Sequence, residues 1–207
     1  MRPLARLVGR AMAAYVRLVA ATSHVAGDVT RDQVILAFWH EYNLAAAVVA
    51  WHTRRERHHV SFSTQTFRGE VMNAMLAAIG AGSVPLPAEN ERAAAARLSR
   101  ELARLGREGA TVAVSPDGPV GPYRRAKPGA LIVARESGLP LQPWAVVARP
   151  SLRLAGRWDR HVVPLPFGRM RVVEADPIAV ADRQPIRPLL ARLQSALDEV
   201  AGRADAG

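Results

Sequence analysis

The sequence contains no cysteine, which excludes disulfide bonds, thiolate metal sites and cysteine nucleophiles. It also has no apolar run that approaches the roughly 20 residues of a membrane-spanning helix. The first residues lack the apolar core and the cleavage site of a secretory signal. We therefore expect a protein that stays inside the cell.

Lysine is nearly absent, since Lys127 is the only one, yet the chain is strongly basic. Lys and Arg number 28 against 18 Asp and Glu, which gives a formal net charge of +10 carried almost wholly by arginine. Guanidinium groups match phosphate oxygens two at a time, so nucleic acid, anionic lipid headgroups or a phosphorylated cofactor are the implied partners. An arginine-rich composition spread over the surface would explain part of the excess. Nucleic acid is disfavoured because no helix-turn-helix, finger or ribonucleoprotein-type motif is present.

The chain of 207 residues is most simply one domain, and its apolar patterns alternate between strands and helices. Short apolar runs predict buried strands at 34–38, 60–62, 111–114 and 141–147. Helical periodicity predicts helices at 42–51, 71–79, 94–105, 131–136 and 186–200. A polar turn is expected at 23–31, short strand fragments broken by prolines at 152–173, and a frayed end at 201–207. This alternation predicts an α/β fold with a mostly parallel central sheet and helices on both faces.

Residues 1–22 predict an amphipathic helix that precedes a single domain at 23–207. Four arginines fall on one stripe: Arg2, Arg6, Arg10 and Arg17. The opposite arc is apolar: Leu4, Leu7, Val8, Met12, Tyr15, Leu18 and Val19. This pattern is typical of a helix lying at a membrane surface. A helix packed on its own domain with the arginines outward would give the same pattern.

A stiff loop follows the strand predicted at 111–114. Between Ser115 and Gly129 it holds four prolines and three glycines, one carboxylate at Asp117, and cations at Arg124, Arg125 and Lys127. Such a loop can hold an anionic ligand, although a surface turn with solvated charges fits the composition equally well.

Two further polar groups also follow predicted strands, namely His40 and the turn from Arg68 to Glu70. Ligands of open α/β sheets gather outside the carboxyl ends of the strands. We therefore expect His40, this turn and the Asp117 loop to meet on one rim of the sheet.

Several short blocks resemble a known family. They are Phe38-Trp39-His40, Arg68-Gly69-Glu70, Ser115-Pro-Asp-Gly-Pro-Val-Gly-Pro122, Lys127-Pro-Gly129, Trp158-Asp159-Arg160 and Pro164-Leu-Pro-Phe167. Their order resembles the bacterial branch of the lysophospholipid acyltransferase-like superfamily, most of whose members are known as a domain of unknown function. The resemblance runs from about Gln33 to Pro177.

The resemblance implies a glycerolipid acyltransferase-like fold and an acyltransferase. The enzyme would move a fatty acyl group from an acyl thioester, acyl-CoA or acyl carrier protein, to a hydroxyl of a lysophospholipid or another lipid. No bound cofactor or metal is expected, and His40 would be the general base. Substrate would be held by loop residues and cations: Arg68, Gly118, Pro119, Gly121, Arg124, Arg125 and Lys127. The protein would be cytoplasmic and peripheral, on the inner face of an anionic membrane. The alternative is a non-catalytic protein of this fold that binds anionic lipid.

Two places depart from the family pattern, and one of them is the stretch Val84 to Asn90, where relatives show Arg-Gly-Ser. The other lies close to His40. The superfamily carries an aspartate five residues after the histidine, where it orients the imidazole, and Ala45 stands there in this chain. Glu70 is the first candidate to replace it, Asp117 the second and Asn43 the third; Arg68 could instead pair with Glu70. The histidines at positions 52, 58 and 59 lack carboxylates at ligand spacing, so no metal site is expected.

Overall fold

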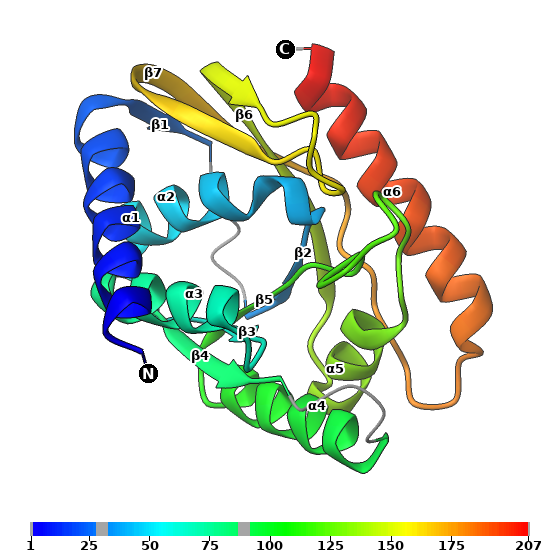
Figure 1. Ribbon diagram of the computed structural model, residues 1–207. Helices are drawn as coiled ribbons and strands as arrows, with labels where there is room; N and C mark the ends of the chain where they lie inside the picture. The colour runs from blue at the N-terminus through cyan, green and yellow to red at the C-terminus, as the bar shows by residue number, and fades with distance from the viewer. Residues whose placement is uncertain (1, 28–32, 87–91, 207) are drawn as a thin grey trace.

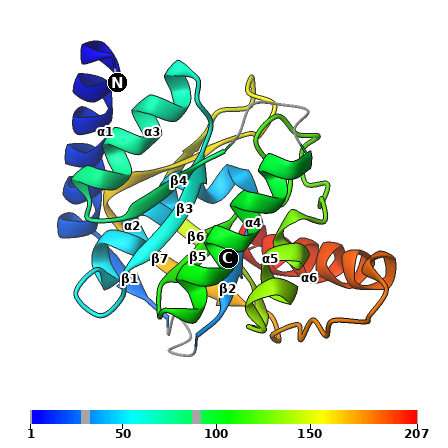
Figure 2. The ribbon, with the colours of Figure 1, turned by 90° about the horizontal axis from the view of Figure 1, so that it is seen from below.

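The computed structural model describes residues 2–27, 33–86 and 92–206, in which seven strands form one sheet with helices on both faces (Figure 1, Figure 2). The strand order is β1-β7-β6-β2-β5-β3-β4. The strands are β1 (His24–Ala26), β2 (Ile35–Ala37), β3 (His59–Ser63), β4 (Gly82–Pro85), β5 (Thr111–Val114), β6 (Leu141–Arg153) and β7 (Val162–Glu174). The helices are α1 (Pro3–Thr22), α2 (Asn43–Thr53), α3 (Phe67–Ala78), α4 (Arg92–Arg107), α5 (Gly129–Ser137) and α6 (Ile186–Ala206), with a 3₁₀ turn η1 (His40–Tyr42).

All neighbouring strands run parallel except β6 and β7, which are antiparallel. The α/β fold with a mostly parallel sheet is therefore confirmed. The central strand β2 lies between β5 and β6 and is buried along its whole length, because helices cover the sheet from both sides.

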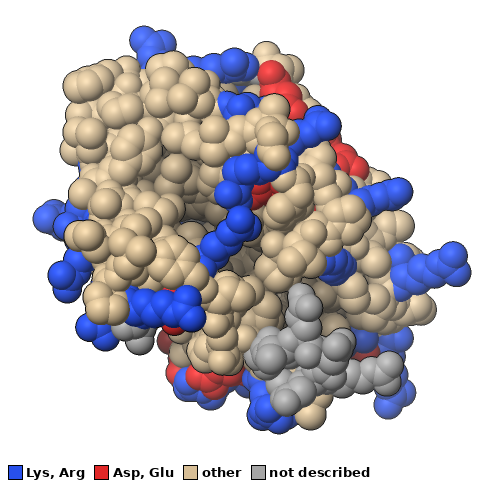
Figure 3. All heavy atoms as spheres, in the orientation of Figure 1, with Lys and Arg blue, Asp and Glu red and all other residues tan. Residues whose placement is uncertain are grey.

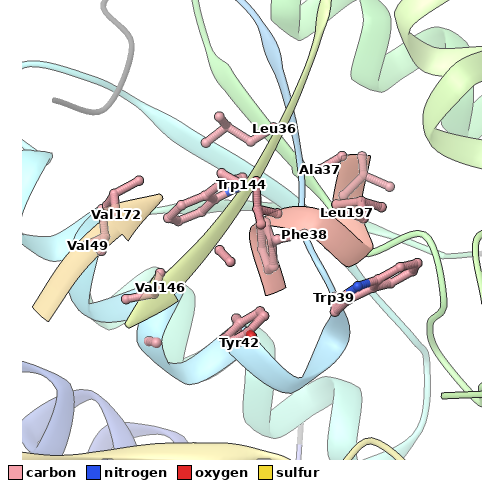
Figure 4. Close-up of a cluster of buried hydrophobic side chains, with 14 of the residues drawn as sticks. Leu36, Ala37, Phe38, Trp39, Tyr42, Val49, Trp144, Val146, Val172 and Leu197 are labelled. Atoms are coloured by element: carbon pink, nitrogen blue, oxygen red, sulfur yellow. The ribbon is translucent and has the colours of Figure 1, made fainter. Parts of the chain in front are cut away.

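The core gathers around the end of β2. Figure 4 shows side chains from β2, α2, β6, β7 and α6 meeting there. Phe38 packs edge-on against Trp144, with ring centroids 5.0 Å apart. Trp39 is fully buried next to it. These two large rings fix the chain immediately before His40.

The region expected as short strand fragments is instead a long hairpin of β6 and β7. The prediction failed because prolines usually interrupt strands. Arg149 pairs with Arg169 and Ser151 with Pro164, so Pro166 lies within a register shift of the hairpin, where its missing N–H breaks no regular ladder bond. β1 lies within the stretch expected as a polar turn, of which residues 28–31 lie outside the described residues.

The end expected to fray is helical, because α6 continues to Ala206. Ala201 and Ala204 are buried, and Asp205 forms ion pairs with Arg124 and Arg153. Residue 207 lies outside the described part of the chain.

The fully buried face of the first helix consists of small and β-branched side chains, while Met12 and Tyr15 are partly buried against the core. Its buried face consists of Ala5, Gly9, Ala13, Val16 and Val19. At Gly9 an added Cβ would stand 2.4 Å from the Cβ of Ala74, so α1 and α3 approach closely. Larger apolar side chains point outward instead: Leu7 is 66% exposed and Leu18 is 48% exposed. None of the helices in the described residues is long and apolar enough to cross a membrane.

Candidate active site

His40 stands at the carboxyl end of β2, on the first residue of η1. The chain reaches it from a fully buried strand, and the N–H of Phe38 still bonds the carbonyl of Val114 on β5 at 3.3 Å. The His40 side chain is 22% exposed. The fold therefore holds the backbone of this residue rigidly while its ring reaches the surface.

A buried carboxylate orients the His40 ring. Nδ1 of His40 lies 3.0 Å from Oδ2 of Asp159, whose side chain is fully buried. An ionised carboxylate accepts hydrogen bonds, so Nδ1 carries the proton and Nε2 is left with its lone pair. Asp159 comes from the loop between β6 and β7, 119 residues away in the sequence. This arrangement makes Nε2 the atom that can take a proton.

Arg157 keeps Asp159 charged. Its Nε and Nη2 donate to the two carboxylate oxygens at 2.8 and 2.9 Å. Burial by itself raises the pKa of Asp159, but the Arg157 hydrogen bonds and the charges of His161 and Arg157 outweigh it and lower the pKa to about 2. Asp159 is therefore an anion beside the imidazole at every physiological pH.

The loop from Ser115 to Gly129 closes over the rings at its glycines. A Cβ added to Gly118 would lie 3.0 Å from Cδ2 of His40, and one at Gly121 would lie 2.7 Å from Cε3 of Trp158. Gly121 also has φ +82, a conformation that favours glycine. The ring centroids of His40 and Trp158 are 5.1 Å apart. Two of the glycines expected at the site thus give the loop its close contact with these rings.

Asp117 ties this loop to the backbone of His40 instead of to its ring. Its Oδ1 accepts the His40 N–H at 2.9 Å, and its Oδ2 accepts the Arg124 N–H at 3.3 Å. The side chain is fully buried, and burial raises its pKa against the effect of these hydrogen bonds. Asp117 therefore positions two segments relative to each other.

The carboxylate that the sequence ranked first for orienting His40 lies elsewhere. Glu70 accepts a hydrogen bond from the N–H of Arg2 at 2.9 Å, so it joins the first turn of α3 to the start of α1. Asn43 accepts from the hydroxyl of Ser115 at 2.9 Å. Asp159 is the residue that bonds the His40 ring, and none of the three candidates, Glu70, Asp117 and Asn43, does so in the described residues. Arg68 is exposed and does not pair with Glu70 among the described residues.

The expected phosphate-holding cations of the loop divide into three cases. Arg124, with φ +49, turns inward and pairs with Glu41 and Asp205. The ammonium of Lys127 donates to the carbonyl of Gly118 at 3.1 Å. Arg125 is exposed, and among the described residues its guanidinium has no partner. Pro119 lies between the two glycines that approach the rings.

A second charged cluster lies directly behind His40. The buried carboxylate of Glu41 accepts from Nε of Arg124 at 2.6 Å, from Arg153, and from the hydroxyl of Tyr123 at 3.1 Å. Asp205 bonds the same two arginines at 2.9 and 2.7 Å. The cluster joins η1, the Asp117 loop, β6 and the end of α6.

One trio in the described residues could in principle hold a metal ion, namely His40, Asp159 and His161, whose ligand atoms lie within 4.8 Å of one another. Both oxygens of Asp159 already accept from Arg157, whose positive charge disfavours a second cation there. The arrangement suits the orientation of an imidazole better than the binding of a metal.

The face shown in Figure 1 is hollowed in front of α2, and basic side chains run along this hollow (Figure 3). The helix that begins just after His40 therefore borders a basic depression. Positive charge at such a place favours anionic ligands.

No family model matches this chain. An uncharacterized protein of Rickettsia prowazekii (strain Madrid E) is 30% identical over 151 residues, which make up 72% of this chain and 66% of that protein. The chain therefore matches just under two thirds of that relative's length.

Among solved structures, the 1-acyl-sn-glycerophosphate (LPA) acyltransferase PlsC of Thermotoga maritima is similar, with a TM-score of 0.54. The likeness covers 98% of this chain and 83% of that one at 15% sequence identity. It shows that the two proteins share a fold.

Proposed function

We propose that this protein is an acyltransferase that moves a fatty acyl group from an acyl thioester, either acyl-CoA or acyl carrier protein, to a hydroxyl of a lysophospholipid or another lipid. The observation that carries the proposal is the His40 ring, fixed by its 3.0 Å contact with buried Asp159 while its edge stays open. A fold shared with an LPA acyltransferase supports the same reaction class.

In the proposed reaction, Nε2 of His40 accepts the proton of the acceptor hydroxyl as its oxygen attacks the thioester carbonyl. Asp159 stabilises the imidazolium that forms. Collapse of the tetrahedral intermediate breaks the carbon–sulfur bond, and the imidazolium returns its proton to the departing thiolate. Lys127, held on Gly118 beside the ring, supplies positive charge for the developing oxyanion.

The loop cations take different parts in this proposal. The guanidinium of Arg125 has donors available for the phosphate of a substrate. The guanidinium of Arg124 forms ion pairs with Glu41 and Asp205 instead. Arg124 therefore holds the loop in place, and Arg125 is the loop arginine that we propose contacts substrate.

Membrane contact is the second part of the proposal, and α1 supports it. The helix uses small residues to pack on α3 and leaves Leu4, Leu7 and Leu18 exposed. Arg6 and Arg10 lie on the adjacent stripe of the same exposed surface, whereas the guanidinium of Arg17 donates to the carbonyl of Ala78 and lies over the ring of Trp51. Such a helix can place leucines at the acyl boundary and arginines at anionic headgroups.

A transfer assay tests the catalytic proposal. A panel of acyl thioesters with a lipid extract, read by mass spectrometry, should reveal the acylated product. His40→Ala should lower the rate about a hundredfold or more, because a general base contributes that much. His52→Ala, which changes an exposed histidine of α2, should leave the rate unchanged. Undiminished turnover in folded His40→Ala protein would remove His40 from the mechanism.

A sedimentation assay tests the membrane proposal. The protein should bind vesicles that contain anionic lipid and partly dissociate as salt rises, with each basic residue near the surface worth about 1 kcal/mol. Changing Leu7 and Leu18 together to Ser should weaken binding, since both side chains point away from the core. The control changes Leu152 and Leu154 to Ser, which are also exposed but lie on and after β6. Equal binding by both variants would contradict a role for α1. Vesicle binding without any transfer would favour the non-catalytic alternative.

A further inference from the structure

An open pocket of about 530 Å³ lies beside the Glu41 cluster, between β6, β7, the Asp117 loop and the end of α6. Its lining includes the buried apolar side chains of Val146, Val162 and Ala204. The volume is in the range of pockets that bind small organic ligands. Neither His40 nor Trp158 lines it, so it is distinct from the surface of the imidazole.

The charges around this pocket do not balance. Four guanidinium groups line it, those of Arg124, Arg149, Arg153 and Arg160, whereas the nearby carboxylates are Glu41 and Asp205. Two positive charges therefore remain uncompensated. Arginines gathered at this density repel one another, and an anion that enters between them removes that cost.

Two of the four arginines keep donors available for such an anion. Arg149 makes one hydrogen bond, 3.3 Å long, to the carbonyl of Asp205. Arg160 lies over the ring of Tyr123, 4.9 Å from its centroid. Within the described residues neither has an ion pair, and both are exposed. Planar guanidinium groups of this kind suit the bidentate binding of phosphate.

The pocket adjoins the proposed active site through the chain itself. Tyr42, which lines the pocket, is two residues after His40, and Arg160 directly follows Asp159. Consecutive Cα atoms are about 3.8 Å apart, so the lining begins within two residues of both members of the His40–Asp159 pair. A ligand held there would lie next to the reacting groups without covering them.

We propose that this pocket binds the phosphate-bearing end of a substrate, with Arg149 and Arg160 on the phosphate and the apolar side chains of the lining against its organic part. This assignment rests on the proposed acyl transfer, which offers two sources of such a group. One is the nucleotide end of an acyl-CoA, and the other is the headgroup of a lysophospholipid.

Calorimetric titration of the full chain tests the pocket without turnover. The probes are adenosine 3′,5′-bisphosphate for the donor, glycerol 3-phosphate for the acceptor, and inorganic phosphate as a common reference. One organic phosphate should bind more tightly than inorganic phosphate, and its identity assigns the source. If neither organic phosphate binds, or both bind no better than inorganic phosphate, the proposal is overturned.

The variant Arg149→Ala with Arg160→Ala should weaken that binding about tenfold or more, because it removes charge-assisted hydrogen bonds. It leaves the ion pairs of Glu41 and Asp205 intact. The control changes exposed Arg187 and Arg192 of α6 to Ala, which removes the same net charge elsewhere. An equal loss of affinity in both variants would mean unspecific attraction and overturn the pocket.

His40→Ala separates this inference from the proposed function. It should bind the organic phosphate as the unchanged protein does, because His40 does not line the pocket. If the protein transfers no acyl group but binds the organic phosphate in a way that depends on Arg149 and Arg160, the proposed binding pocket stands and the proposed acyl transfer is refuted. Transfer with an unchanged KM for both substrates in the Arg149→Ala, Arg160→Ala protein would refute the pocket and keep the transfer.

Discussion

His40 and Glu41 are adjacent in the chain, yet they enter two networks of opposite character. His40 meets one buried carboxylate, which Arg157 neutralises, and within the described part of the chain nothing bonds its Nε2. Glu41 is buried under two arginines and a tyrosine, so its oxygens are satisfied. The first network leaves one atom open for chemistry, while the second leaves none on its carboxylate.

The difference shows how similar chemical groups divide between reaction and support. A fully satisfied buried charge cluster can fix the relative positions of distant segments, and the Glu41 cluster joins four of them near the imidazole. A group that must take up a proton needs a fixed direction and an open edge, which Asp159 and the exposed rim give to His40. The closed network therefore supports the open one.

Breaking the closed network should give the largest effect on stability. Glu41→Ala leaves Arg124 and Arg153 without their buried partner, and such a loss typically costs about 3–5 kcal/mol in the free energy of unfolding. Urea unfolding followed by circular dichroism measures it. Glu101→Ala is the control, because Glu101 pairs with Arg104 on the exposed side of α4 and should cost less than about 1 kcal/mol. Similar costs for the two variants would show that the Glu41 cluster contributes little to the fold.

Changing the open network should affect catalysis more than stability. Asp159→Asn keeps the size of the side chain but removes the charge that stabilises the imidazolium, so the rate of acyl transfer should fall about a hundredfold or more. The free energy of unfolding should fall by about 1 kcal/mol, since the partner Arg157 is 41% exposed and its pair is screened.

Asp182→Asn, which changes an exposed aspartate before α6, is the control for the Asp159 experiment and should retain the full rate. An unchanged rate of acyl transfer in Asp159→Asn would show that the His40–Asp159 network does not serve catalysis. A large fall in the free energy of unfolding, with a normal transfer rate per folded molecule, would mean that Asp159 stabilises the fold, as Glu41 does, and takes no part in catalysis.

The sequence was sufficient for β2, β3, β5 and the first half of β6 because their signals are local, whereas β1 and β4 were not predicted. The apolar run before Phe38 and the periodicity of α6 show burial directly, and the parallel α/β class follows from their alternation. Prolines misled the prediction for the segment 152–173, because Pro166 lies within a register shift of the β6–β7 hairpin, where a strand tolerates proline. The face of α1 that packs was not predicted because close helix contact selects small residues such as Gly9, not large apolar ones.

The sequence predicted the part of the candidate site that follows the strand ends, but not the residue that contacts the His40 ring. Strand ends brought His40 and the Asp117 loop to one rim, and their contact at 2.9 Å is present. Asp159 carried a signal in the Trp158-Asp159-Arg160 block, but no spacing rule connects it to a histidine 119 residues away. The inward turn of Arg124 depends on Glu41 and on Asp205, and Asp205 lies in the segment 201–207, which was expected to fray.

Acid should weaken the open network with the smallest effect of all. Asp159 has a pKa of about 2 in the folded protein, against about 3.9 for an ordinary aspartate in an unfolded chain. A carboxyl group with a lowered folded-state pKa contributes stability above its unfolded pKa and loses that contribution as pH falls through the folded value. The roughly 1 kcal/mol between the unchanged protein and Asp159→Asn should therefore be constant from pH 7 to about 5 and shrink between about 4 and 2. Urea unfolding of both proteins across this range measures the difference, with Asp182→Asn run beside them to correct for acid effects elsewhere. A difference that stays constant down to pH 2.5 would mean that packing around the side chain, and not the charge held by Arg157, is what Asp159 contributes to the fold.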